Sequence, residues 1–137
     1  SSGNTIINGT TQLGDAVGDT VTCNGRMRIV NEIQYADSAV TISGDAIAAN
    51  SSYMILTSQS STADALHEMT GGVTGQIIVL QAADGHTITV HNNEGDASTN
   101  KFLLNGDADF VMNSVGDSLQ CIYRNGVGWC EIGRSAN

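Results

Sequence analysis

The sequence predicts an all-β protein, either an antiparallel β-sandwich or a barrel-like jelly-roll of short strands. Short apolar runs alternate with clusters of Ser, Thr, Asn, Asp and Gly, the residues that favour turns. The chain holds 16 Gly and no Pro in 137 residues, a length typical of one domain. Residues 103–135 show the pattern most clearly, with alternating strands joined by Gly-Asp and Asn-Gly turns.

The N-terminal part is predicted to begin with an extended arm. Residues 1–12 are mostly polar, and we expect a single β domain over residues 13–137. Within it, strands are predicted at residues 20–23 and 27–33, on either side of an Asn24-Gly25 turn. A further short strand is predicted at residues 40–42.

The middle of the chain contains one apolar run and one ambiguous segment. Tyr53–Thr57 reads YMILT, a continuous apolar run typical of a strand buried on both faces. Residues 62–69 fit either one or two helical turns or a turn that leads into a short strand. We favour the strand, because Gly71 and Gly72 leave little room for a helix.

Residues 76–82 and 86–91 are predicted to form a hairpin around a two-residue Asp84-Gly85 turn. That register places Val79 opposite Val90 and predicts a shared core face: Ile77, Val79, Ile88 and Val90. Ile78 and Leu80 would then lie on a second face, which is also expected to be covered.

A second hairpin is predicted around Asn125-Gly126, because this pair favours a type I′ turn. Its register pairs Ile122 with Trp129 and Cys121 with Cys130. One face of the hairpin would then carry Leu119, Cys121, Tyr123, Cys130 and Ile132, and the other Ile122 and Trp129. A hairpin with apolar residues on both faces needs two partners, the domain core and another layer or subunit.

Charge and hydropathy narrow the range of functions. A net charge of −9, with only five basic residues, argues against nucleic-acid binding. No apolar stretch approaches the ~18 residues of a membrane span. The polar start predicts no signal peptide. The initial Ser1 indicates removal of Met, cleavage or an engineered scar.

Metal-binding patterns are weak in the sequence. Gly-Asp turns could supply carboxylate ligands for calcium, but Asp is also a common turn residue, and we favour the turn role. The candidate calcium ligands are Asp15, Asp19, Asp45, Asp96, Asp107, Asp109 and Asp117. The histidines, His67, His86 and His91, lack helical metal spacing, although a ring of histidines around an oligomer axis is conceivable. No CxxC or HxxxH spacing occurs, so the sequence predicts no metal site and no cofactor.

Covalent and catalytic chemistry is not predicted either. Three cysteines are an odd number, which argues against a disulfide framework. Cys121 and Cys130 face each other in the expected hairpin and could form a strained cross-strand disulfide, but we favour two free thiols that pack as small apolar groups. No GxSxG motif is present. We expect a non-enzymatic protein without catalytic residues.

The sequence resembles virion structural proteins of tailed bacteriophages. The segment GGVTGQIIVLQAADGHTITVHNNEG, followed by LNGDADFVMNSVGDSLQCIYRNGVGWCEIGRS, is similar to the β-rich end domains of phage fibres and to small capsid decoration proteins. The resemblance covers residues 66–135 well and residues 10–27 loosely. It implies a homotrimer without catalysis, located on the virion.

Two functions are compatible with that resemblance. The first is a decoration, or cement, protein that binds the major capsid protein or other virion proteins on the outer surface of a phage head and stabilises it. The alternative is a fibre tip that binds a host receptor or glycan, but we find no long stalk in the sequence and favour decoration. Phe110, Ile122 and Trp129 are the predicted subunit interface.

Overall fold

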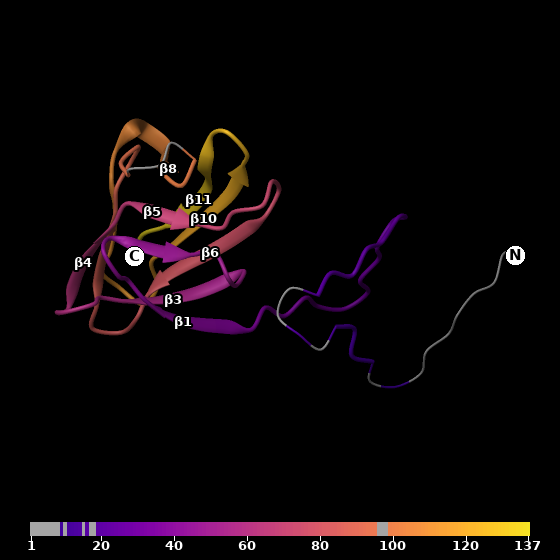
Figure 1. The fold of residues 1–137 in the computed structure, drawn as a ribbon. Helices are drawn as coiled ribbons and strands as arrows, with labels where there is room; N and C mark the ends of the chain where they lie inside the picture. The colour runs from indigo at the N-terminus through magenta and orange to yellow at the C-terminus, as the bar shows by residue number, and fades with distance from the viewer. Residues whose placement is uncertain (1–8, 10, 15, 17–18, 96–98) are drawn as a thin grey trace, which may run out of the picture. The chain divides into compact units, whose positions relative to one another are not determined.

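The structure is a computed structural model that describes residues 9, 11–14, 16, 19–95 and 99–137. The chain divides into two units, Ser1–Ile33 and Gln34–Asn137 (Figure 1). The regular elements among the described residues of the second unit are strands and one 3₁₀ turn, which confirms the all-β class. Within the described residues, no helix has the length and apolar character that a membrane span requires.

The described residues of the first unit form neither strand nor helix. The strands predicted at residues 20–23 and 27–33 are therefore not present within the single chain. Large apolar side chains of this unit are exposed, namely Leu13, Val21, Met27, Ile29, Val30 and Ile33. The predicted arm, residues 1–12, falls mostly outside the described residues.

The described residues of the second unit form three sheets, and several of their strands are labelled in Figure 1. The largest sheet has six strands, in the order β1 (Asp37–Thr41), β3 (Tyr53–Thr57), β6 (Ile77–Ala82), β10 (Ser118–Arg124), β11 (Gly128–Ser135) and β8 (Phe102–Leu103). A second sheet pairs β2 (Ala46–Ala48) with β5 (Glu68–Thr70). The third sheet is β4 (Ala63–Leu66), β7 (Thr87–Val90) and β9 (Phe110–Met112).

The chain winds in successive circuits, and strands at equivalent positions of neighbouring circuits pair in parallel. The pairs β1–β3, β3–β6, β2–β5 and β4–β7 are all parallel, so each circuit adds strands beside those of the previous one. This repeated winding suggests a short β-solenoid rather than the expected antiparallel sandwich or jelly-roll. Short strands and Gly-rich turns occur in both architectures, so the sequence pattern did not distinguish corner turns from hairpin turns.

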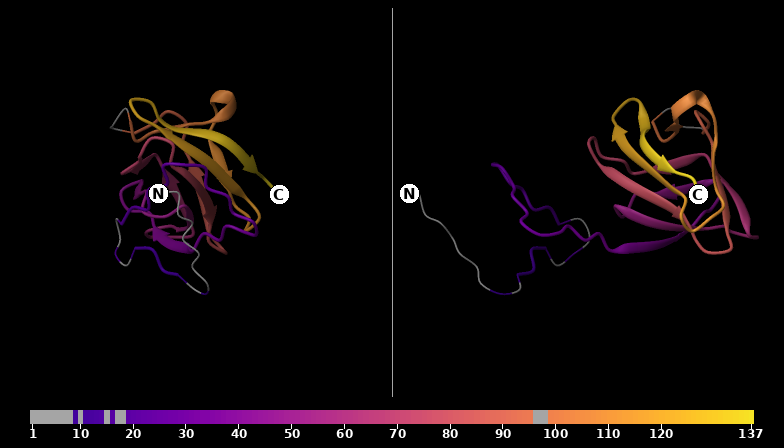
Figure 2. Two further views of the ribbon diagram at one scale, coloured as in Figure 1. Left: turned by 90° about the vertical axis from the view of Figure 1, so that its right-hand side faces the viewer. Right: turned by 180° about the vertical axis from the view of Figure 1, so that it is seen from behind.

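The winding reverses after the third circuit. The 3₁₀ turn η1 (Asn105–Asp107) includes positive φ angles at Gly106 and Asp107. Beyond it, β9 pairs antiparallel with β7, and β10 pairs antiparallel with β6. The β10–β11 hairpin (yellow in Figure 2) therefore covers the edge of β6 that a further parallel strand would occupy.

The core of the second unit is built from apolar side chains at matching register positions. Leu80 lies between Met54 of β3 and Leu119 of β10, and all three side chains are fully buried. Val90 lies in the same way between Leu66 and Phe110. Each such burial contributes about 1.5–3 kcal/mol relative to an exposed side chain. Apolar residues at equivalent positions of successive circuits thus hold the stack together.

Two predicted strands are confirmed, but their predicted hairpin is wrong. Strands β6 and β7 lie in different sheets, so Val79 does not pair with Val90. Gly85 has a φ of 75°, and residues 83–86 turn a corner between sheets. Because β6 pairs elsewhere, its buried face is Ile78, Leu80 and Ala82, the opposite of the predicted one, whereas Ile88 and Val90 of β7 are buried as expected.

The β10–β11 hairpin exists, but its register is one residue away from the predicted one. Tyr123 pairs with Trp129, and Ile122 with Cys130, because the loop has three residues instead of two. Gly128 has a φ of 120°, and a Cβ there would lie 2.6 Å from the backbone oxygen of Lys101. The close approach of Lys101 to β11 therefore requires glycine at position 128. The longer loop moves Trp129 to the buried face, beside Tyr123.

Segment 62–69 and the run Tyr53–Thr57 follow the predictions more closely. Residues 62–69 include β4 and lead into β5, as expected, and form no helix. Strand β3 matches Tyr53–Thr57, although one of its faces is buried and the other is half-buried. Residues 40–42 lie partly in β1.

Candidate functional site

The predicted interface residues lie on the second unit with unequal exposure. Trp129 is fully buried within the chain, and Phe110 is 5% exposed. Arg134 covers the ring of Phe110, with its guanidinium carbon 4.6 Å from the ring centre. Ile122 is half-buried. Of the three, Ile122 keeps the most surface for a partner, and the other two stabilise the chain itself.

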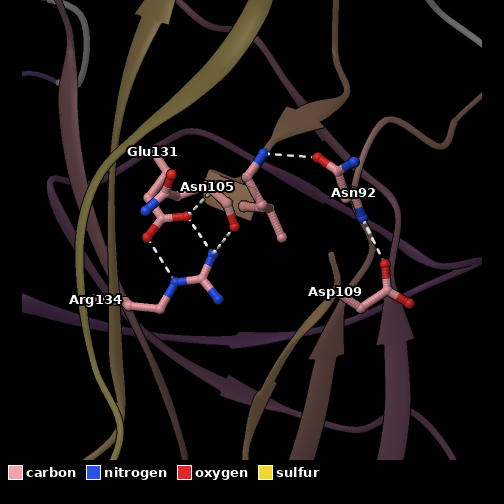
Figure 3. Close-up of polar contacts among 6 residues, drawn as sticks. Asn92, Asn105, Asp109, Glu131 and Arg134 are labelled. Carbon is pink, nitrogen blue, oxygen red and sulfur yellow. Dashed lines mark hydrogen bonds and ion pairs between the residues drawn. The ribbon is translucent and has the colours of Figure 1, made fainter. Parts of the chain in front are cut away.

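A polar network joins η1 to strand β11 (Figure 3). Arg134 binds the carboxylate of Glu131 with two guanidinium nitrogens, one of which lies 2.6 Å from Oε1. Glu131 Oε2 also accepts a 2.7 Å hydrogen bond from the backbone nitrogen of Asn105. The Arg134 guanidinium lowers the pKa of Glu131, and this contribution outweighs the rise caused by burial. The network fixes the point where the chain reverses.

Asn92 connects the same region to the third sheet. Its backbone nitrogen donates a 2.8 Å hydrogen bond to Asp109 Oδ1, and its side-chain oxygen accepts one from Leu104 (Figure 3). Asp109 is thereby held at the start of β9. Its second oxygen, Oδ2, lies 3.0 Å from Nδ1 of His91.

His91 is one of four residues that form a histidine–carboxylate cluster, His67, His91, Glu94 and Asp109. The two imidazole rings are 4.4 Å apart and nearly perpendicular, at 79°. Glu94 Oε2 lies 3.7 Å from His67 Nε2 and 3.6 Å from His91 Nδ1. One ligand atom from each of these three residues lies within 4.8 Å of the other two.

The cluster is assembled by strand register. Leu66 pairs with Val90 in parallel, so the histidine that follows each of them occupies the same place in successive circuits. Val90 also pairs antiparallel with Phe110, which brings Asp109 next to His91. A cavity of about 370 Å³ adjoins the cluster and is lined by Gly44, Asp45, His67, Glu68, Glu94 and Gly95.

The remaining candidates are placed elsewhere. His86 lies at another corner, where Nδ1 is 2.9 Å from the Ser58 hydroxyl. Cys121 and Cys130 are free and do not pair across the hairpin, and burial raises the pKa of the Cys121 thiol. Asp117 accepts backbone hydrogen bonds, in agreement with a turn role. Among the described residues, the calcium candidates form no cluster of three; Asp15 and Asp96 lie outside that part.

Sequence reasoning did not bring His67 and His91 together. They are 24 residues apart, and helical or local strand spacing cannot relate them. The usable signal was an apolar residue followed by His at 66–67 and again at 90–91, the offset that the parallel β4–β7 register imposes. Without knowledge of a solenoid circuit, that offset had no structural meaning.

Comparisons of the chain with protein-family models, with curated proteins and with solved structures found no match.

Proposed function

We propose that this chain is a non-enzymatic structural protein that acts by self-assembly, as a homotrimer that decorates the outer surface of a tailed-phage head. The observation that carries the proposal is the exposed apolar character of the first unit. The six large apolar side chains among its described residues are 43–82% exposed, whereas the described part of the second unit has a buried apolar core. Exposed apolar surface of this kind marks a site of association with another chain.

Residues 27–33, here called the assembly segment, supply the most regular part of that surface. Met27, Ile29 and Ile33 fall on one side of an extended strand and Arg28 and Glu32 on the other, with Val30 as an apolar exception on that second side. Met27, Ile29 and Ile33 are 69%, 43% and 59% exposed, and no strand forms here within one chain. A second copy of the chain can complete such a strand by backbone pairing and cover its apolar face.

Assembly on a phage head, rather than glycan binding at a fibre tip, is supported by the aromatic residues. Sugar-binding sites use exposed aromatic rings, and this chain has six aromatic residues. Four are buried, namely Phe102, Phe110, Tyr123 and Trp129. The virion location proposed for either function rests on the expected resemblance of residues 66–135 to phage end domains. The partner on the head would be the major capsid protein.

The first test is the native mass of the full chain by light scattering, at low and high salt. We expect a mass near three times 14.2 kDa that persists in high salt, because apolar contacts are not screened. The double variant Ile29→Glu/Ile33→Glu should be monomeric. Its matched control, Arg28→Gln/Glu32→Gln, alters the opposite side of the assembly segment and should remain trimeric. A monomeric wild-type chain at micromolar concentration would refute self-assembly.

The second test separates decoration from receptor binding. The assembled chain should co-sediment with purified phage heads and raise their rupture temperature, and the monomeric double variant should do neither. Binding to a glycan array, with no binding to heads, would instead establish the fibre-tip alternative.

A further inference from the structure

We propose that His67, His91 and Glu94 bind a divalent transition-metal ion, with Zn²⁺ as the best match to their donor atoms. Two imidazole nitrogens and one carboxylate oxygen are a common protein donor set for Zn²⁺. The proposal is independent of the assembly described above, because it concerns one chain and residues of its second unit.

The distances suit such an ion. Zn²⁺ binds nitrogen and oxygen ligands at about 2.0–2.1 Å in tetrahedral geometry, which separates neighbouring ligand atoms by roughly 3.3 Å. The Glu94 oxygen lies 3.7 and 3.6 Å from the two imidazole nitrogens. All three ligand atoms lie within 4.8 Å of one another, so side-chain adjustment would bring them to coordination distance.

One atom of the cluster lacks the partner that its burial demands. His91 Nδ1 is buried and makes no hydrogen bond with any described residue. Asp109 Oδ2 lies 3.0 Å away, close enough for an ion pair, but the two atoms do not meet hydrogen-bond geometry. Buried polar atoms are nearly always satisfied, so an unsatisfied nitrogen between two carboxylates calls for a further partner. A cation bound by Glu94 and His91 would provide it.

Carboxyl groups lie around the two histidines of the histidine–carboxylate cluster, and a cavity next to it gives an ion access. Glu94 and Asp109 place two carboxyl groups beside the imidazoles, a donor set that suits a divalent cation. Asp109 is not one of the three clustered residues, but its Oδ2 lies 3.0 Å from His91 Nδ1, the nitrogen assigned to the ion, so it is the nearest further carboxylate. The adjacent cavity offers room for a water molecule as the fourth ligand.

Bound metal would join three parts of the second unit. His67 follows β4, His91 follows β7, and Glu94 lies in the loop beyond. An ion that binds the folded but not the unfolded chain stabilises the fold by mass action. We therefore expect metal to raise the melting temperature.

The test uses the full chain with Cys23→Ser, because the exposed Cys23 thiol could itself bind zinc. After treatment with chelator and desalting, ZnCl₂ is titrated by calorimetry. We expect one ion per chain, micromolar or tighter affinity, and a melting temperature higher by about 5 °C or more at saturation. Mg²⁺ at the same concentration should produce no shift, because it prefers oxygen ligands.

Three variants determine where the ion binds. His67→Gln and His91→Gln should each weaken zinc binding at least tenfold, while His86→Gln, the matched control at a different corner, should bind like the parent. Circular dichroism of each variant checks that it remains folded. In a folded parent, Co²⁺ should give the visible absorption of a four-coordinate ion. Absence of zinc binding by the parent, or equal affinity in all three variants, would overturn the proposal.

Discussion

The indole Nε1 of Trp129 donates a 2.7 Å hydrogen bond to the backbone oxygen of Met69. Trp129 is fully buried, and its ring lies 5.0 Å from that of Tyr123. The bond joins β11, near the C-terminal end of the chain, to β5 in the second circuit. The largest side chain of the core thus connects the reversed hairpin to the parallel stack.

Replacing this indole should destabilise the fold before it affects assembly. Trp129→Phe leaves the Met69 oxygen unsatisfied and should cost about 1–3 kcal/mol of unfolding free energy. Trp129→Ala also creates a cavity and should cost about 3–5 kcal/mol. Urea denaturation measures both. Ile132→Ala, at a 52% exposed position, should cost less than about 0.5 kcal/mol. Unchanged stability with a lower native mass would instead assign Trp129 to the interface.

Gly72 lies against the ring of Tyr123. A Cβ at position 72 would be 2.3 Å from the Tyr123 Cδ2, and the backbone of Gly72 does not have a positive φ. Gly72→Ala should therefore destabilise through overpacking alone, by about 1–3 kcal/mol. The urea midpoint should fall. Gly133→Ala is the control, because nothing lies within 4 Å of its Cβ position and its φ is not positive. Equal midpoints for the two variants would contradict this packing.

Asp117 should make stability depend on pH in the acidic range. Its carboxylate accepts backbone hydrogen bonds from Asn137, Asn113 and Ser114, at 2.8, 2.9 and 3.0 Å, which lower its pKa. A carboxyl with a lower pKa in the folded state stabilises the fold above its unfolded pKa, about 3.9. This contribution is lost as pH falls through the lower, folded value.

The variant Asp117→Asn removes the charge and should melt at a lower temperature than wild type at pH 7. The gap should close as the pH is lowered through the range below about 3.9. Melting curves from pH 7 to pH 2 provide the measurement. Asp84→Asn, in an exposed corner turn, is the control and should follow the wild type throughout. A gap that stayed constant with pH would show that the carboxylate charge is not responsible.

The ion pair of Arg134 and Glu131 should matter more than an ordinary surface pair. The Glu131 side chain is 5% exposed, so Arg134→Gln leaves a carboxylate with little access to water. We expect a loss of about 1–3 kcal/mol at neutral pH. The loss should shrink in acid, because without the guanidinium the Glu131 pKa is no longer held down, and the variant's carboxyl takes up a proton at a higher pH than that of the wild type. Urea denaturation of Arg134→Gln and of the exposed control Arg124→Gln, at pH 7 and pH 4, tests both statements.

Local chemistry explains which predictions succeeded. Tyr53–Thr57 is short, apolar and bounded by polar residues, so it forms a strand in any all-β arrangement. Gly71 and Gly72 stop a helix over residues 62–69 whatever packs on them. These outcomes depend on propensities that act within a few residues.

The choice of partner strand explains the predictions that were wrong. Asp84 and Gly85 turn the chain, but a corner and a hairpin use similar residues, and the parallel pairing of β6 with β3 decided which one formed. In the β10–β11 hairpin, contact with Lys101 at Gly128 favoured a three-residue loop over the tighter turn. Residues 27–33 have a strand pattern but no partner strand within the described chain.

The sequence by itself determined the all-β class, several strand positions and the acidic character of the protein, because composition and short-range patterning suffice for these. Tertiary structure alone decided the parallel stacking, the buried face of β6 and the meeting of His67 with His91. Each depends on which distant strand pairs with which. Backbone groups can form hydrogen bonds with almost any other strand, so side-chain packing across whole circuits selects the partner.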